Sequence, residues 1–99
     1  MNADPSEELR METRVQRTGI GTLLLQRLPD QRRFWAPVAS WGRCLEATEV
    51  EESRVMLELK ALREGCHKLA DFTAFSPHLT MKISPELKAL LKISNRAHP

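Results

Sequence analysis

The sequence predicts one small, mainly helical domain that is built around a long central helix and completed by a second copy as a dimer. The 99 residues, of which 41% are hydrophobic and 28% charged, suffice for one domain and exclude a multidomain enzyme. Residues 55–69 carry apolar side chains at helical spacing, and signals for helix starts occur near residues 48 and 84. A chain this short buries little surface, so an apolar face left over favours self-association.

Residues 1–17 predict a flexible N-terminal arm, which leaves residues 18–99 as the single helical domain. The arm is rich in Asn, Asp, Pro, Ser and charged side chains, and its few large apolar side chains cannot offset the entropy lost on ordering. After a turn at 18–21, residues 22–28 form a short apolar segment that Pro29 ends. Because leucine favours helix as readily as strand, this segment is either helical or one short N-terminal strand.

Residues 30–45 predict a helix. The apolar residues Phe34, Val38, Trp41 and Leu45 follow one another at spacings of four, three and four, which is typical of one helix face. Pro37 interrupts this segment, since proline removes a backbone hydrogen bond and clashes with the preceding turn. We therefore expect the helix either to kink or to begin near Pro37.

The segment after residue 47 predicts the long central helix. Thr48 and Glu51 fit a capping box. In this motif the Thr48 side chain accepts a hydrogen bond from the backbone N–H of Glu51, and the Glu51 side chain accepts one from the backbone N–H of Thr48. Five apolar residues then alternate spacings of four and three along one seam: Val55, Leu59, Leu62, Cys66 and Leu69. A second copy of this chain or a larger protein would cover such a seam, and an ordinary core helix of a small bundle is the alternative. Gly65 indicates close packing or a local break.

The C-terminal part predicts a connector over 72–80 and a further helix. Ser84 is a natural N-cap, and Pro85 suits the first helical position. Leu87, Leu90 and Leu91 match the L-x-x-L-L pattern of helices that dock in apolar grooves, although the pattern also arises by chance in amphipathic helices.

The chemistry-bearing residues form no catalytic or metal-binding motif, so we expect neither an enzyme nor a cofactor. Cys44 and Cys66 lack a CxxC spacing and a histidine that completes a zinc set, and we expect both to be buried thiols. His67 follows Cys66 directly, but successive residues of a helix point about 100° apart, so the two do not form a dyad. Without an apolar stretch of membrane-spanning length or a basic, then apolar N-terminus, we expect a cytoplasmic protein without membrane contact.

The net charge of +2 conceals a segregation of charge along the chain. Residues 13–45 are strongly basic, residues 1–12 and 46–71 are acidic, and residues 72–99 are basic again. In the first basic block every cation is an arginine: Arg14, Arg17, Arg27, Arg32, Arg33 and Arg43. Guanidinium groups suit phosphates and base edges better than lysine does, so these six arginines are the predicted nucleic-acid-binding residues.

Residues 21–62 resemble the ribbon-helix-helix DNA-binding family as it occurs in accessory proteins of plasmid mobilisation. The resemblance rests on Leu23–Leu28, the following Pro29-Asp30-Gln31-Arg32-Arg33, and the capped helix downstream. It implies a strand that pairs with that of a dimer mate in the major groove. In that arrangement Leu23, Leu25 and Arg27 point into the groove, and Leu24 and Leu28 into the dimer core. Met81–Leu87 resembles the same strand-to-helix entry.

Two functional hypotheses follow. The first is a small DNA-binding accessory protein, with plasmid mobilisation or regulation as the form that the resemblance implies, dimerising through its central helix. The alternative is a helical protein-interaction module without nucleic-acid affinity, whose arginines form a solvated face.

Overall fold

The fold is a mixed α/β arrangement with one four-stranded sheet, so the predicted mainly helical class is wrong. The computed structural model describes residues 8–28, 34–74, 76 and 78–97, with the side chains of 93–97 excepted. The strands are β1 (Leu9–Val15), β2 (Gly19–Arg27), β3 (Trp35–Cys44) and β4 (Leu79–Lys82). The helices are the short 3-10 helix η1 (Ala47–Glu49), α1 (Arg54–Lys68), α2 (Ala70–Thr73) and α3 (Pro85–Ala97).

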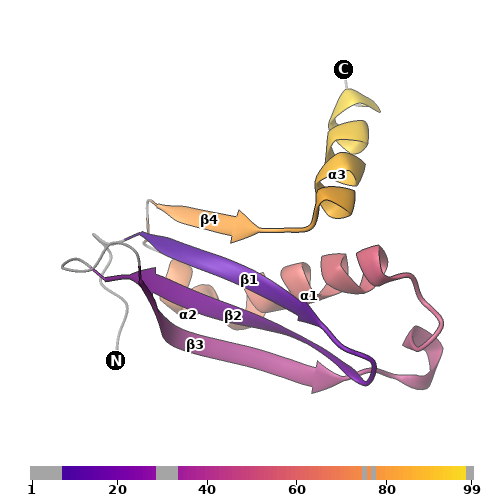
Figure 1. Cartoon of the computed structure of the whole chain (residues 1–99), viewed down its shortest axis with the longest axis horizontal. Helices are drawn as coiled ribbons and strands as arrows, with labels where there is room; N and C mark the ends of the chain where they lie inside the picture. Colours follow the sequence, from indigo (N-terminus) through magenta and orange to yellow (C-terminus); the bar gives the residue numbers. More distant parts are fainter. Residues whose placement is uncertain (1–7, 29–33, 75, 77, 98–99) are drawn as a thin grey trace.

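The sheet has the strand order β3-β2-β1-β4. The first three strands form an antiparallel meander, and β4 pairs in parallel with β1. A parallel pair needs a long crossover connection, and here α1 and α2 supply it by leading from β3 at one edge to β4 at the other. Figure 1 shows both helices behind the strands, so one face of the sheet is covered and the other carries no described helix.

The core lies between α1 and the covered face of the sheet. Successive strand residues point to opposite faces, and the odd-numbered residues of β1 and the even-numbered residues of β2 point towards α1. Leu9, Met11 and Leu24 are fully buried there, and Leu62 of α1 packs against them.

Strand β1 falls within the predicted arm. Its side chains alternate between apolar residues, which are buried, and charged residues, which stay at the surface. Burial of Leu9 and Met11 against α1 stabilises a segment whose average composition looked too polar to order. Residues 1–7, the rest of the predicted arm, lie outside the described residues.

The predicted helix over 30–45 is wrong over 35–44, which form β3. A bulge between the partners of Leu24 and Leu25 shifts the β2–β3 register by one residue. An extra residue of this kind breaks strict alternation and produced the four-three-four spacing of the apolar residues. Pro37 is exposed on an edge strand, where the missing backbone N–H removes little pairing.

Helix α1 approaches β2 closely at Gly65. The Thr22 hydroxyl donates to the carbonyl oxygen of Ala61 at 2.8 Å, and a Cβ at position 65 would collide with the Thr22 side chain. Gly65 therefore serves close packing, one of the two roles that the sequence left open.

Two predicted helices are confirmed, one of them with a corrected start. Helix α1 begins at Arg54 rather than near Thr48, because Ser53 is its N-cap and accepts from the backbone N–H of Met56. The capping box is formed two residues earlier than predicted, by Glu46 and Glu49 around η1. Helix α3 begins at Pro85 as expected, and the Ser84 hydroxyl accepts from the backbone N–H of Leu87 at 3.2 Å.

The ribbon-helix-helix arrangement is not formed by residues 21–62. Strand β2 lies inside the sheet with β1 on one side and β3 on the other, so it has no free edge for the strand of a second chain. Its Leu24 belongs to the core of this chain, and the expected first helix is β3.

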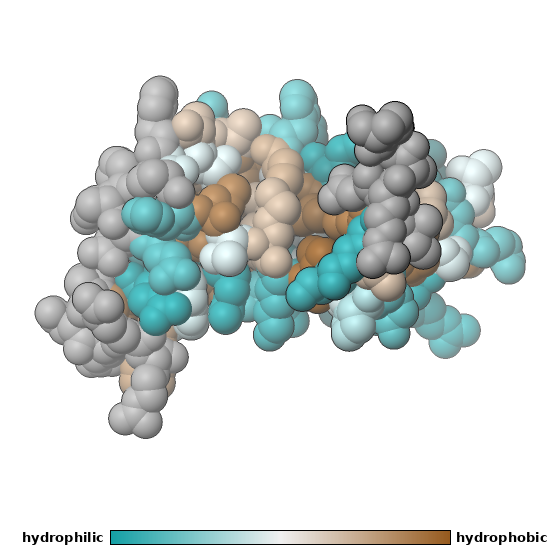
Figure 2. Space-filling model, turned by 90° about the horizontal axis from the view of Figure 1, so that it is seen from above, coloured by the Kyte–Doolittle hydropathy of each residue, from teal (hydrophilic) through white to brown (hydrophobic). Residues whose placement is uncertain are grey.

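The edge strand β4 is short and lies beside apolar surface. Figure 2 looks onto this side of the molecule and shows apolar atoms in the middle of the view with polar atoms around them. Met81 is exposed on β4, as are Leu90 and Leu91 on α3, whereas Leu87 is fully buried. The three leucines of the L-x-x-L-L pattern therefore do not share one exposed face. Within the described part of the chain, every helix is too short or too polar to cross a lipid bilayer.

Candidate nucleic-acid interface

The face of the sheet opposite α1, called the open face below, gathers basic and aromatic side chains from all four strands. The even-numbered residues of β1 and the odd-numbered residues of β2 point to this face, since their strand neighbours point to α1. Lys82 of β4 pairs with Glu12 of β1 and joins the same face. Its basic and aromatic members are Arg10, Arg14, Arg27, Lys82 and Trp35.

Trp35 forms the centre of this surface. The guanidinium carbons of Arg10 and Arg27 lie 4.3 and 4.8 Å from the centroid of its ring. Each arginine also contacts one carboxylate, Arg10 with Glu12 at 2.9 Å and Arg27 with Glu8 at 3.0 Å. The ring of Trp35 thus holds both guanidinium groups on the open face, where each also pairs with a carboxylate.

Arg14 lies at the end of the open face away from Trp35, beside two glycines that carry no side chain. Its partner on β2 is Gly21, which in turn pairs with Gly42 of β3. Gly42 is exposed and Gly21 is buried, and the side chain of Arg14 beside them is exposed. Among the described residues no ion pair engages Arg14.

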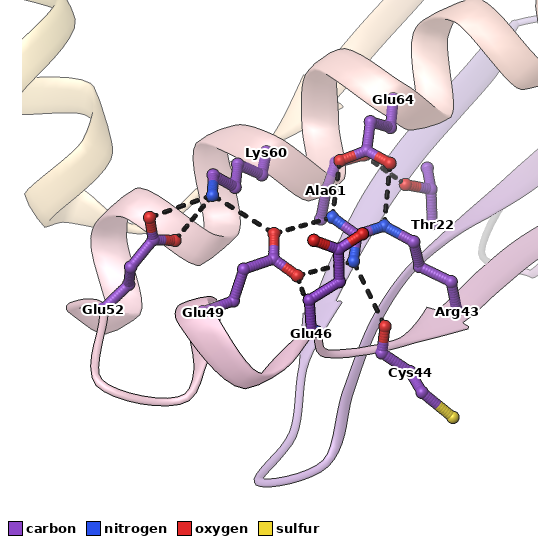
Figure 3. Close-up of polar contacts among 9 residues, drawn as sticks. All are labelled: Thr22, Arg43, Cys44, Glu46, Glu49, Glu52, Lys60, Ala61 and Glu64. Atoms are coloured by element: carbon purple, nitrogen blue, oxygen red, sulfur yellow. Dashed lines mark hydrogen bonds and ion pairs between the residues drawn. The ribbon is translucent and has the colours of Figure 1, made fainter.

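Arg43 lies on the covered face and serves the fold instead (Figure 3). Its guanidinium donates to both carboxylate oxygens of Glu49, at 2.7 and 2.8 Å, and to both of Glu64, at 2.8 Å each. A further bond reaches the carbonyl oxygen of Cys44 at 3.1 Å. These contacts tie the end of β3 to η1 and α1, so Arg43 has little capacity left for a phosphate.

Glu49 is the centre of this cluster, which we call the Glu49 cluster: Arg43, Glu46, Glu49, Glu52, Lys60 and Glu64. The Glu49 side chain is only 5% exposed, and it accepts from Lys60 at 3.1 Å and from the backbone N–H of Glu46 at 2.9 Å. Hydrogen bonds from Arg43, then from Glu46, hold the pKa of Glu49 well below its usual range. The same guanidinium lowers the pKa of Glu64, and the bonds to Glu52 and Glu49 raise the pKa of Lys60.

Of the three remaining predicted arginines, the structure describes one. Arg17 is exposed in the turn that joins β1 to β2, where the N–H of Gln16 bonds the carbonyl of Gly19. Arg32 and Arg33 lie outside the described residues. The structure thus brings Arg14 and Arg27 to one face, places Arg43 on the other, and leaves Arg17 at the rim.

Sequence reasoning missed Arg10, Trp35 and Lys82. The alternation of charged and apolar residues along 9–15 is the signal that could have found Arg10, because period-two alternation is typical of a half-buried strand. Trp35 and Lys82 had no local signal, since their place on the open face depends on the strand order.

The predicted dimer seam is occupied within this chain. Leu62 and Leu69 are buried in the core, and Val55, Leu59 and Cys66 pack against it. The sheet therefore covers the seam, as the alternative of an ordinary core helix expected. The four-three spacing of the apolar residues along α1 is then no argument for a second chain.

The cysteines and histidines form no reactive group. Cys66 is half-buried, donates to the sulfur of Met11 at 3.7 Å, and has its pKa raised by burial. Cys44 is exposed rather than buried, because it points away from α1 at the end of β3. His67 is exposed, and within the described ranges no three His, Cys, Asp or Glu side chains are placed to hold a metal ion.

Comparison with known proteins adds no family, since no protein-family model matches this chain and no curated protein matches its sequence.

Proposed function

We propose that this protein binds a single strand of nucleic acid across the open face of its sheet. The observation that carries the proposal is the stacking of Arg10 and Arg27 over Trp35 on a sheet face that no described helix covers. Aromatic rings and guanidinium planes on an exposed sheet are the surfaces on which unpaired bases stack. Arg14 and Lys82 supply positive charge along the same face for the phosphates.

The shape of the open face favours a single strand over a duplex. Reading the major groove requires an element narrow enough to enter it, either a helix or a two-stranded ribbon. The arginines here lie instead on the inner strands β1 and β2, each flanked by neighbours on both sides. A flat surface of this kind contacts splayed bases, whereas a duplex would touch it only through its backbone.

The two carboxylates of the open face moderate this binding. Glu8 and Glu12 hold Arg27 and Arg10, and a bound phosphate would compete with them. Both pairs are partly exposed, with side-chain exposures between 18% and 40%, and ion pairs near the surface stabilise a protein by only about 1 kcal/mol, so a phosphate can displace them. We therefore expect binding of moderate affinity with a strong dependence on salt.

Fluorescence anisotropy of a labelled single-stranded oligonucleotide, measured at several salt concentrations, tests the proposal. With about three to four phosphate contacts, affinity should fall roughly 20- to 50-fold between 50 and 200 mM salt. Arg14→Gln should weaken binding and reduce the slope of log K against log salt by about 0.7.

Arg63→Gln is the matched control, because it removes the same charge from the exposed surface of α1 and should leave the salt slope unchanged. Equal affinity for duplex and single strand would contradict the shape argument. No binding to either at 50 mM salt would reject a nucleic-acid function and favour the protein-interaction alternative.

A further inference from the structure

A pocket lies where β4 ends and the chain turns into α3. Strand β4 pairs with β1 only as far as Lys82 opposite Glu12, whereas β1 continues to Val15. The space in which a longer β4 would run is therefore empty, and it forms a cavity of about 410 Å³. The start of α3 and the first turns of α1 close its other sides.

Three cations from three different elements line this pocket: Arg14 of β1, Arg54 at the start of α1, and Lys82 at the end of β4. All three are exposed, and within the described ranges none of them takes part in an ion pair. Like charges that share one pocket repel one another, so their grouping favours an anion between them.

The two carboxylates that line the pocket are already engaged. Glu12 contacts Arg10 at 2.9 Å rather than its neighbour Lys82. Glu58 is buried in the wall and accepts from the backbone N–H of Ser84 at 2.7 Å, from the Ser84 hydroxyl, and from the Thr13 hydroxyl at 3.5 Å. Its charge therefore stabilises the start of α3, where the helix dipole favours a negative group. Arg10 balances the charge of Glu12, whereas Glu58 bonds neutral donors and keeps its charge, so three cations and one carboxylate leave the pocket with a net charge of about +2.

We propose that this pocket is a binding site for a phosphate group, held by Arg14, Arg54 and Lys82. A phosphate monoester carries nearly two negative charges and three acceptor oxygens, which matches three cations that approach from different sides. Arginine adds a planar pair of donors that fits two phosphate oxygens at once. A carboxylate, with one charge and two oxygens, would leave one cation without a partner.

The site goes beyond the proposed strand binding, because Arg54 belongs to α1 on the covered side of the sheet. The phosphate has two possible sources, the 5′ end of a strand lying on the open face or a small phosphate ester. Both present the same group to the pocket.

Titration of the ¹⁵N-labelled full chain with inorganic phosphate at constant ionic strength tests this site. We expect saturable shifts of amide signals at residues 12–15, 54–58 and 82–84. Arg54→Gln and Lys82→Gln should each weaken phosphate binding about tenfold, the effect of losing one charge-assisted contact. Lys88→Gln removes an exposed charge from α3 outside the pocket and should leave the affinity unchanged. Shifts that do not saturate, or that persist unchanged in both pocket variants, would overturn the site.

Oligonucleotides with a 5′-phosphate and with a 5′-hydroxyl then distinguish the sources. If the strand end fills the pocket, the phosphorylated strand binds more tightly to the native chain, and Arg54→Gln removes the difference. If a small ester fills it, both strands bind alike while inorganic phosphate still saturates the pocket. Saturable phosphate binding without affinity for either strand would reject the proposed function and leave this site standing.

Discussion

Arg43 and Arg27 lie on opposite faces of one sheet, and their surroundings differ in kind. Arg43 contacts all four oxygens of two carboxylates and joins three elements of the fold. Arg27 stacks on Trp35 and contacts Glu8, whose side chain is 40% exposed, whereas Glu49 beside Arg43 is 5% exposed. The covered face thus uses Arg43 to hold two carboxylates, one of them buried, and the open face holds its arginines over an aromatic ring. The basic block of residues 13–45 therefore contains one arginine that ties elements of the fold together and another that belongs to the proposed binding surface.

Removing Arg43 should produce the largest loss of stability. Arg43→Met leaves Glu49 and Glu64 without their main donor, and breaking a buried pair costs about 3 to 5 kcal/mol. Because the Arg43 side chain is 27% exposed, we expect about 2 to 3 kcal/mol in the free energy of unfolding. Urea unfolding followed by circular dichroism measures it. Arg63→Met on the exposed side of α1 is the control, and equal losses in the two variants would refute the structural role of Arg43.

Filling the close contact between α1 and β2 should destabilise the protein by less. Gly65→Ala gains about 1 kcal/mol of helix propensity, but the added methyl group collides with Thr22, and such overpacking costs about 1 to 3 kcal/mol. We expect a net loss of about 1 kcal/mol in the same urea experiment. Thr22→Ala in the Gly65→Ala background should recover part of that loss, and a stabilised single variant would contradict the observed packing.

Acid should destabilise the fold through the two glutamates that Arg43 binds on the covered face. The folded protein lowers the pKa of Glu49 and Glu64 through Arg43. Each group therefore stabilises the fold fully above its unfolded pKa of about 4.5, and this contribution is lost as pH falls through the lower folded pKa. Thermal melts between pH 7 and pH 3 should show a steep loss of stability below pH 4.5. Glu49→Gln should flatten this decline, and an unchanged decline would show that other carboxylates cause it.

The smallest expected effect is a gain in affinity for nucleic acid rather than a loss of stability. Glu12→Gln removes a carboxylate from the open face and releases Arg10 from its ion pair. Affinity for a single-stranded oligonucleotide should rise about threefold, since an exposed pair contributes about 0.5 to 1 kcal/mol. Anisotropy titrations compare this variant with Glu51→Gln, which removes an exposed carboxylate outside the open face. A fall in affinity would mean that Glu12 positions Arg10 rather than competes with phosphate.

The sequence predicts the helices better than the sheet. Ser84 and Pro85 mark the start of α3, and the four-three spacing of apolar residues predicts α1. Both are local signals, because caps and helical periodicity are set by residues close in sequence. Strand β1 was missed since its alternating charges lower its average hydrophobicity. Strand β3 was missed because a bulge at Val38 lets Val38 and Trp41 both pack against the core at a helix-like spacing of three.

The division of the arginines depends on contacts that are distant in sequence. Arg43 binds Glu64, which lies 21 residues further along the chain. The ring of Trp35 on β3 contacts Arg10 of β1, although β1 and β3 are not neighbours in the sheet. No local pattern distinguishes Arg43 from Arg27, so the basic block alone could predict a binding region but not its members.

The two tryptophans test the central claim most directly, because Trp35 lies on the open face and Trp41 packs against the core on the covered face. Trp41→Phe leaves Trp35 as the remaining tryptophan of the chain, and Trp35→Phe leaves Trp41. If bases stack on the open face, a single-stranded oligonucleotide should quench the fluorescence of the Trp41→Phe protein in a saturable manner and leave that of the Trp35→Phe protein nearly unchanged. Quenching of Trp41 with Trp35 unaffected would contradict the account.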